Sequence, residues 1–157
     1  MSRRQFCAVD GRNLMALTNI KDANNHITSH LAYGLLRSDA IAVTANAQYD
    51  LYAWVRGKLD PGVDTGVSEW IMRVLFYNSS SGSLGSLDVD SGNPGTLSTG
   101  WQQEGGRFTT PSNTASVRID LHNYLNSGWV AFDDVSFIKV GTGTNLAPNY
   151  GFESSGS

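Results

Sequence analysis

Residues 115–121 read ASVRIDL, and apolar and polar side chains alternate along the whole stretch. The apolar positions are Ala115, Val117, Ile119 and Leu121, and the polar positions between them are Ser116, Arg118 and Asp120. Successive side chains of a β-strand point to opposite faces of its sheet. The stretch therefore predicts a strand with one face in a core and the other face toward solvent.

Two further segments show the same alternation, YDLYAWVR at 49–56 and WIMRVLFY at 70–77. In the first, Leu51, Ala53 and Val55 lie opposite Tyr52, Trp54 and Arg56; in the second, Trp70, Met72, Val74 and Phe76 lie opposite Ile71, Arg73, Leu75 and Tyr77. No segment sustains helical spacing over a dozen residues. Stretches rich in Gly, Pro, Asn and Asp, the residues of tight turns, separate the strands at 58–69, 78–85 and 90–100. The sequence predicts an all-β fold, a two-sheet antiparallel β-sandwich of about eight to ten strands with jelly-roll connections.

The composition of the chain argues against several classes of partner. The chain has 157 residues, 16% of them charged, and a net charge of −3. Its 11 Lys and Arg are scattered apart from Arg3 and Arg4, whereas nucleic-acid binding needs a clustered basic face. No apolar run approaches the ~20 residues of a membrane span. A single cysteine, Cys7, excludes an internal disulfide. We expect no nucleic-acid partner and no membrane partner.

Four segments, taken in order, resemble a known family. They are SDAIAVTANAQYDLYAWVRG at 38–57, VLFYNSSSG at 74–82, GWQQEGGRFTTPSNTASVRIDL at 100–121 and SGWVAFDDVSF at 127–137. Together they resemble the calcium-containing carbohydrate-binding modules appended to xylanases, mannanases and cellulases, often called the family 4, 9, 16 and 22 type, a galactose-binding-like jelly roll. The resemblance implies a non-catalytic module that binds a plant-wall-like polysaccharide or oligosaccharide. It also implies an extracellular or particle-associated location, although residues 2–6 only resemble a twin-arginine core and no apolar signal segment follows them.

The family's opening motif stands at the wrong end of this chain. Such modules begin with a segment like N-L-x-x-N-x-G-F-E, but here NLAPNYGFE at 145–153 follows the D-D-V-S-F of 133–137. We expect residues 1–28 to be an arm of uncertain packing, 29–140 to be the sandwich, and 141–157 to supply the opening strand. That strand folds back on its own sandwich or pairs with a neighbouring copy in a strand-swapped homo-oligomer. The alternative is the stub of a second module.

The resemblance also implies a structural calcium ion held by Glu153 and Asp133, with Asp134 as the alternate ligand. Hard oxygen ligands of this kind suit Ca²⁺. Asp133 has the parity of Val135 and Phe137, so its carboxylate is expected to point inward if those residues are core. The alternative is that both aspartates are solvated residues at a strand end.

Flat aromatic faces and planar polar side chains on the wetter strand faces are the candidates for sugar contacts. From the strand alternation they are Tyr52, Trp54, Arg73, Tyr77 and Arg118, with Asp120 beside Arg118. If their strands share one sheet, the side chains form a single aromatic and polar groove. The resemblance adds Gln103 and Trp129, which lie where the family often places ligand contacts. It also implies that Trp101, in a position the family uses structurally, packs. The alternative for Trp54 is burial beneath loops.

A catalytic function is not expected. His26, His30 and His122 lie in no protease or triad spacing, and Cys7 has no context that would activate a nucleophile. The carboxylates show no pairing that glycosidase chemistry requires. The competing hypothesis to sugar binding is a structural or adhesion module of a phage particle or surface protein, because a fold alone does not decide function.

Overall fold

The computed structural model describes residues 6–8, 27–29, 34–58, 69–93, 100–124 and 129–147. These residues form ten β-strands and no helix, and among them no helix is long and apolar enough to span a membrane. The strands are β1 (Phe6–Ala8), β2 (Ile27–Ser29), β3 (Gly34–Ser38), β4 (Ile41–Ala42), β5 (Gln48–Lys58), β6 (Glu69–Tyr77), β7 (Ser83–Gly92), β8 (Gln102–Thr109), β9 (Ser116–Tyr124) and β10 (Trp129–Lys139).

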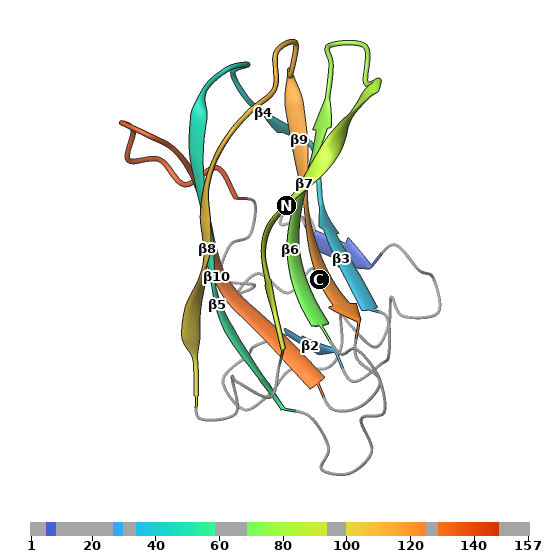
Figure 1. Ribbon diagram of the computed structural model, residues 1–157, viewed down its shortest axis with the longest axis vertical. Coiled ribbons are helices and arrows are strands. Elements are labelled where there is room, and N and C mark those ends of the chain that lie inside the picture. Colours follow the sequence, from blue (N-terminus) through green and yellow to red (C-terminus); the bar gives the residue numbers. More distant parts are fainter. Residues whose placement is uncertain are drawn as a thin grey trace, which may run out of the picture.

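The strands form two antiparallel sheets that face each other (Figure 1). The six-stranded sheet has the order β1-β3-β9-β6-β7, with β4 also paired to β9, and the four-stranded sheet has the order β2-β10-β5-β8. From β7 onward, consecutive strands alternate between the two sheets, as jelly-roll connections require. The predicted two-sheet sandwich is confirmed.

The core lies between the sheets and consists mainly of inward-facing residues of β3, β4, β5, β6, β8, β9 and β10. The fully buried set from the three alternating segments is Tyr49, Leu51, Ala53, Val55, Trp70, Met72, Val74, Val117, Ile119 and Leu121. Aromatic rings fill the centre, where Phe137 stacks on Tyr49 with a centroid separation of 5.0 Å and on Phe108 at 6.1 Å. The alternation in the sequence therefore predicts correctly which face of each segment lies in the core, but the opposite faces are not all exposed, because Ile71 and Asp120 are buried there.

The alternation does not reveal which strands share a sheet. β5 belongs to the four-stranded sheet, whereas β6 and β9 are neighbours in the six-stranded sheet. The polar faces of β6 and β9 therefore lie on the opposite side of the sandwich from the polar face of β5.

A β-bulge interrupts β10 beside β5. Asp133 pairs with Trp54 and Ser136 pairs with Tyr52, so two residues of β10 oppose the single residue Ala53. Asp134 takes a left-handed conformation with φ of 45°, which Asp tolerates better than most residues. The extra residue reverses the parity, so Asp133 shares the outer face with Trp54. The prediction that Asp133 points inward with Val135 is wrong for this reason.

Both ends of the described chain pack on the sandwich. β1 pairs with β3, and β2 pairs with β10, so two short segments of the predicted N-terminal arm are edge strands. After β10 the chain turns back: the Leu146 N–H donates to the Phe137 carbonyl at 2.7 Å, and Ala147 is buried. Residues 148–157, on which the prediction of a returning strand depends, lie outside the described residues.

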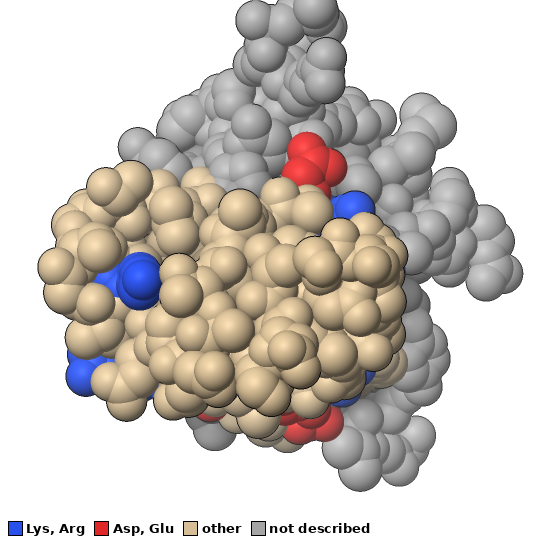
Figure 2. Space-filling view, turned by 90° about the horizontal axis from the view of Figure 1, so that it is seen from above, with Lys and Arg blue, Asp and Glu red and all other residues tan. Residues whose placement is uncertain are grey.

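Tight loops lie at the end of the sandwich that is uppermost in Figure 1. Asn46, Ser81 and Asn113 each have a positive φ, between 54° and 68°, in the turns before β5, before β7 and before β9. The Asn78 side chain caps one of these turns by accepting hydrogen bonds from the N–H groups of Ser80 and Gly82. Seen from above, most of the described surface carries neither Lys or Arg nor Asp or Glu (Figure 2).

Candidate functional site

A row of polar and aromatic side chains crosses the outer face of the four-stranded sheet. Trp54 in β5 lies between Gln103 of β8 and Asp133 of β10 in the strand register. Tyr52, two residues earlier, lies on the same face and is partly buried. The Trp54 side chain is 41% exposed, the most exposed large apolar side chain of the described residues together with Leu87. The fold therefore brings Tyr52, Trp54 and Gln103 together, and Trp54 is not buried beneath loops.

A hollow of about 230 Å³ lies beside this row, and Trp54, Trp101, Asp133 and Asp134 line it. Trp101 is partly exposed at the start of β8, so the expectation that it only packs is incomplete. Asp133 is 9% exposed, and its Oδ1 accepts a hydrogen bond from the Asp134 N–H at 2.9 Å. The bulge thus places two consecutive carboxylates in the same hollow as two indoles.

Sequence patterns alone do not find this hollow. Trp101 precedes β8 and follows a turn, so no alternation marks the face on which it lies. Asp134 reaches the hollow because of the bulge, and nothing in the sequence DDVSF specifies an extra residue except the tolerance of Asp for a positive φ.

An ion pair borders the row beyond Tyr52. Arg107 of β8 and Asp50 of β5 are opposite each other, with Nε and Oδ1 2.7 Å apart. The hydrogen bond from Arg107 holds the pKa of Asp50 below its ordinary value, against the small effect of burial. These two charges neutralise each other at that end of the face.

Three candidate residues, Arg73, Tyr77 and Arg118, lie on the opposite side of the molecule. They belong to β6 and β9, and they occupy the outer face of the six-stranded sheet. The Arg73 guanidinium forms two hydrogen bonds with the Asp88 carboxylate, and Arg118 donates to the Ser38 carbonyl at 3.0 Å. The hypothesis of one groove that contains all the candidates is wrong, because their strands belong to different sheets.

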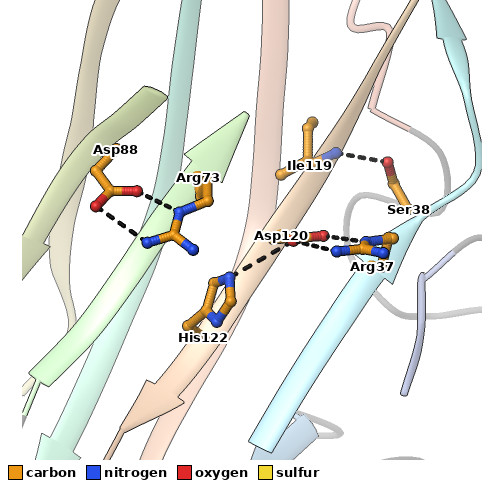
Figure 3. Close-up of polar contacts among 7 residues, drawn as sticks. All are labelled: Arg37, Ser38, Arg73, Asp88, Ile119, Asp120 and His122. Carbon is orange, nitrogen blue, oxygen red and sulfur yellow. Dashed lines mark hydrogen bonds and ion pairs between the residues drawn. The ribbon is translucent and has the colours of Figure 1, made fainter. Parts of the chain in front are cut away.

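The six-stranded sheet carries an ionic network instead (Figure 3). Arg37 donates to both carboxylate oxygens of Asp120, at 2.7 and 2.8 Å, and Asp120 is only 1% exposed. The His122 Nε2 atom lies 3.5 Å from the same carboxylate. Burial raises the pKa of Asp120, but the hydrogen bonds and charges of Arg37 and His122 outweigh it and lower that pKa overall. The Ser38 hydroxyl accepts the Ile119 N–H at 2.9 Å, which ties β3 to β9.

The remaining candidates are only partly covered by the structure. The Trp129 backbone pairs with Lys58 of β5, but its side chain is not described. Glu153 lies outside the described residues. Asp133 and Asp134 offer carboxylate oxygens of the kind calcium prefers, but the described residues contain no cluster of three or more metal-ligating side chains. The calcium site remains a prediction.

No protein-family model matches this sequence, and no curated protein sequence matches it significantly. Solved structures do match its fold. The family 22 carbohydrate-binding module and GH10 modules of Clostridium thermocellum xylanase 10B, in complex with xylohexaose, align with a TM-score of 0.56 and 10% identity over 87% of this chain and 24% of that chain. The C-terminal family 22 module of the same enzyme aligns with a TM-score of 0.51 and 10% identity over 91% of both chains.

A phage protein shares the fold as well. The enzymatically active domain of bacteriophage CBA120 tailspike protein 4 aligns with a TM-score of 0.54 and 9% identity over 73% of this chain. This chain spans only 15% of the tailspike chain and 24% of the xylanase chain. At these identities the likeness establishes the fold, and it confirms that the resemblance to carbohydrate-binding modules extends to the architecture.

Proposed function

We propose that the chain binds a polysaccharide or oligosaccharide, without catalysis, through the hollow and the adjoining row on the outer face of the four-stranded sheet. The observation that carries this proposal is the half-exposed indole of Trp54, which borders a hollow together with Trp101 and two aspartates. Exposing an indole costs hydrophobic free energy, so an indole beside a concave polar surface indicates a binding site.

The chemistry of the lining suits a sugar. An indole presents a flat apolar face that covers the C–H face of a pyranose ring, and carboxylates and the Gln103 amide accept or donate hydrogen bonds to hydroxyl groups. We expect modest affinity, because the hydroxyl groups lose their hydration when the sugar binds an open surface.

Plant-wall-like polysaccharides are the first ligands to test. Affinity electrophoresis of the protein through gels that contain β-glucan, mannan or xylan compares these ligands directly. Retardation in at least one gel supports the proposal and identifies the polymer. Unchanged mobility in all gels, and no binding of any other glycan in solution, contradicts it.

Replacement of the exposed indole tests the site itself. Trp54→Ala removes the stacking face, and we expect the affinity for the retarding polymer to fall about tenfold or more, equivalent to ~1.4 kcal/mol. Leu87→Ala is the matched control, because Leu87 is 40% exposed on β7 in the other sheet. An equal loss of affinity in both variants would argue against a site at Trp54.

The second candidate function is a structural or adhesion module of an extracellular particle or surface, without a working sugar site. The fold shared with a phage tailspike protein favours it. Binding that depends on Trp54 decides between the two candidates, because a purely structural module has no reason to lose glycan affinity with this side chain.

A further inference from the structure

Two consecutive aspartates line the same hollow as two tryptophans, and this combination suits a positively charged ligand group better than a neutral one. We propose that the hollow prefers a glycan whose sugars carry a protonated amine, such as a glucosamine polymer, over the neutral glycan with the same backbone. This inference rests on the proposed function of the same site and specifies its ligand class.

The bulge in β10 is what brings the second carboxylate to the hollow. In an unbroken strand Asp133 and Asp134 would point to opposite faces of the sheet. Here Asp134 adopts a φ of 45°, its N–H is bound by the Asp133 carboxylate, and both residues line the hollow beside Trp54. A left-handed conformation at a residue other than glycine costs free energy and is concentrated at functional sites.

An ammonium group gains from both kinds of lining residue. It is attracted to the face of an indole through the quadrupole of the ring, and it forms an ion pair with a carboxylate, whereas a neutral sugar hydroxyl adds no charge of its own to the same hydrogen bond. A sugar acid would meet repulsion from the same carboxylates, which disfavours acidic polysaccharides.

The described cations of this face lie outside the hollow. No Lys or Arg is among the described residues that line it. Arg107 is paired with Asp50. Arg56 lies on the same outer face as Trp54, opposite Ala131 in the neighbouring residue pair of the register, and is not among the residues that line the hollow. The hollow, at about 230 Å³, is smaller than the ~300–1,000 Å³ pockets of drug-sized ligands, which suits recognition of about one sugar ring.

Three ligands with the same β-1,4-linked backbone isolate the effect of the amine. Isothermal titration of the full chain with cellohexaose, the hexamer of glucosamine and the hexamer of N-acetylglucosamine is carried out in calcium-free buffer at low salt and at a mildly acidic pH that protonates the amines. We expect the glucosamine hexamer to bind about tenfold more tightly than cellohexaose, a difference of ~1.4 kcal/mol. The acetylated hexamer should lose this advantage, and added salt should reduce it.

Two variants locate the effect. Asp134→Asn keeps the shape and tolerates the left-handed conformation, and it should lower the ratio of the affinity for the glucosamine hexamer to the affinity for cellohexaose from about ten to about one. Asp39→Asn changes the net charge equally at an exposed position between β3 and β4, and it should leave both affinities unchanged.

The binding data distinguish the preference for an amine from sugar binding itself. If cellohexaose binds as tightly as the glucosamine hexamer, or if Asp39→Asn reduces amine binding as much as Asp134→Asn, the amine preference of the hollow is overturned and sugar binding stands. If none of the three hexamers binds and no polysaccharide gel retards the protein, the proposed function fails with it.

Discussion

At the scale of single residues, two arginine–aspartate pairs of similar geometry sit in very different surroundings. Asp120 is almost fully buried beneath its contact with Arg37, whereas Asp88, the partner of Arg73, keeps 46% of its side chain exposed. A buried charge that loses its partner destabilises the fold, because neither water nor a counterion solvates it. An exposed charge that loses its partner is solvated by water instead. The sandwich therefore depends on one of these pairs and tolerates the loss of the other.

Neutral substitutions measure this difference. We expect Asp120→Asn to lower the free energy of unfolding by about 2–3 kcal/mol, because Arg37 keeps only part of its hydration and loses its counterion. The matched variant Asp88→Asn should cost less than about 1 kcal/mol. Urea denaturation followed by tryptophan fluorescence gives both values, and equal costs would mean that burial of Asp120 does not control its contribution.

The pH dependence of stability follows from the same carboxylate. The pKa of Asp120 is lower in the folded chain than its ordinary value of about 4. Its contribution to stability is thus fully present above pH ~4 and is lost as the pH falls through the lower pKa of the folded state. The unfolding midpoint of Asp120→Asn should vary less with pH below ~4 than that of the unchanged protein, and identical pH profiles would contradict this assignment.

At the scale of the elements, β10 shows why a single inserted residue decides what a site contains. The alternation of β5 continues without a break, so Leu51 and Val55 are buried and Trp54 is exposed, as the sequence predicts. In β10 the bulge shifts the register between Asp133 and Ser136, and every inference from parity that crosses it reverses. Bulges depend on local backbone geometry that period-two patterns do not contain.

The alternation of apolar and polar residues predicts some strands and misses others. β5, β6 and β9 could be predicted because one face of each is apolar. β7 could not: its residues SLGSLDVDSG are mostly exposed, and their Gly, Ser and Asp indicate turns. Among the described strands it lies at the edge and pairs with β6 alone, so tertiary pairing rather than propensity holds it in the sheet.

The segment after β10 offers a prediction at this scale. The Asn145 side chain accepts hydrogen bonds from the N–H groups of Phe137 and Ala147 and donates one to the Val135 carbonyl. These bonds connect the returning chain to β10. We expect Asn145→Ala to lower the free energy of unfolding by about 1–3 kcal/mol, because these backbone groups lose their partner.

Thr144→Ala serves as the control for this change, since Thr144 is exposed beside the same segment. Its expected cost is within about 0.5 kcal/mol. Chemical denaturation of both variants tests the assignment, and a cost for Asn145→Ala no larger than that for Thr144→Ala would show that the segment contributes nothing to folding stability.

At the scale of the whole molecule, the two outer faces have different compositions. The six-stranded sheet carries paired charges, which satisfy one another across neighbouring strands. The four-stranded sheet carries one such pair, Arg107 with Asp50, but also the exposed indole and the hollow. Because the faces are separated by the aromatic core, substitutions on one face should have additive effects with those on the other. We therefore expect that stability and the proposed ligand binding can be altered separately in this fold.

The C-terminal segment supports a prediction about the whole molecule, which concerns the expected calcium site. Residues 145–147 already return along β10, toward the edge where Asp133 and Asp134 lie. We propose that Glu153 completes a calcium site with one of these aspartates. A bound ion at about 100 times its dissociation constant adds ~2.7 kcal/mol, so removal of calcium by EDTA should lower the melting temperature by about 5–10 °C.

Glu153→Ala should abolish the effect of EDTA, whereas Glu69→Ala, which removes a carboxylate from β6, should preserve it. If the segment folds back on its own sandwich, the calcium effect is independent of protein concentration and the chain elutes as a monomer. A strand-swapped assembly requires a melting temperature that rises with concentration, because its site forms only between copies. A melting curve that EDTA leaves unchanged would remove the calcium site, and the described part of the returning segment would then be held by the hydrogen bonds of Asn145 and Leu146 and by the burial of Ala147.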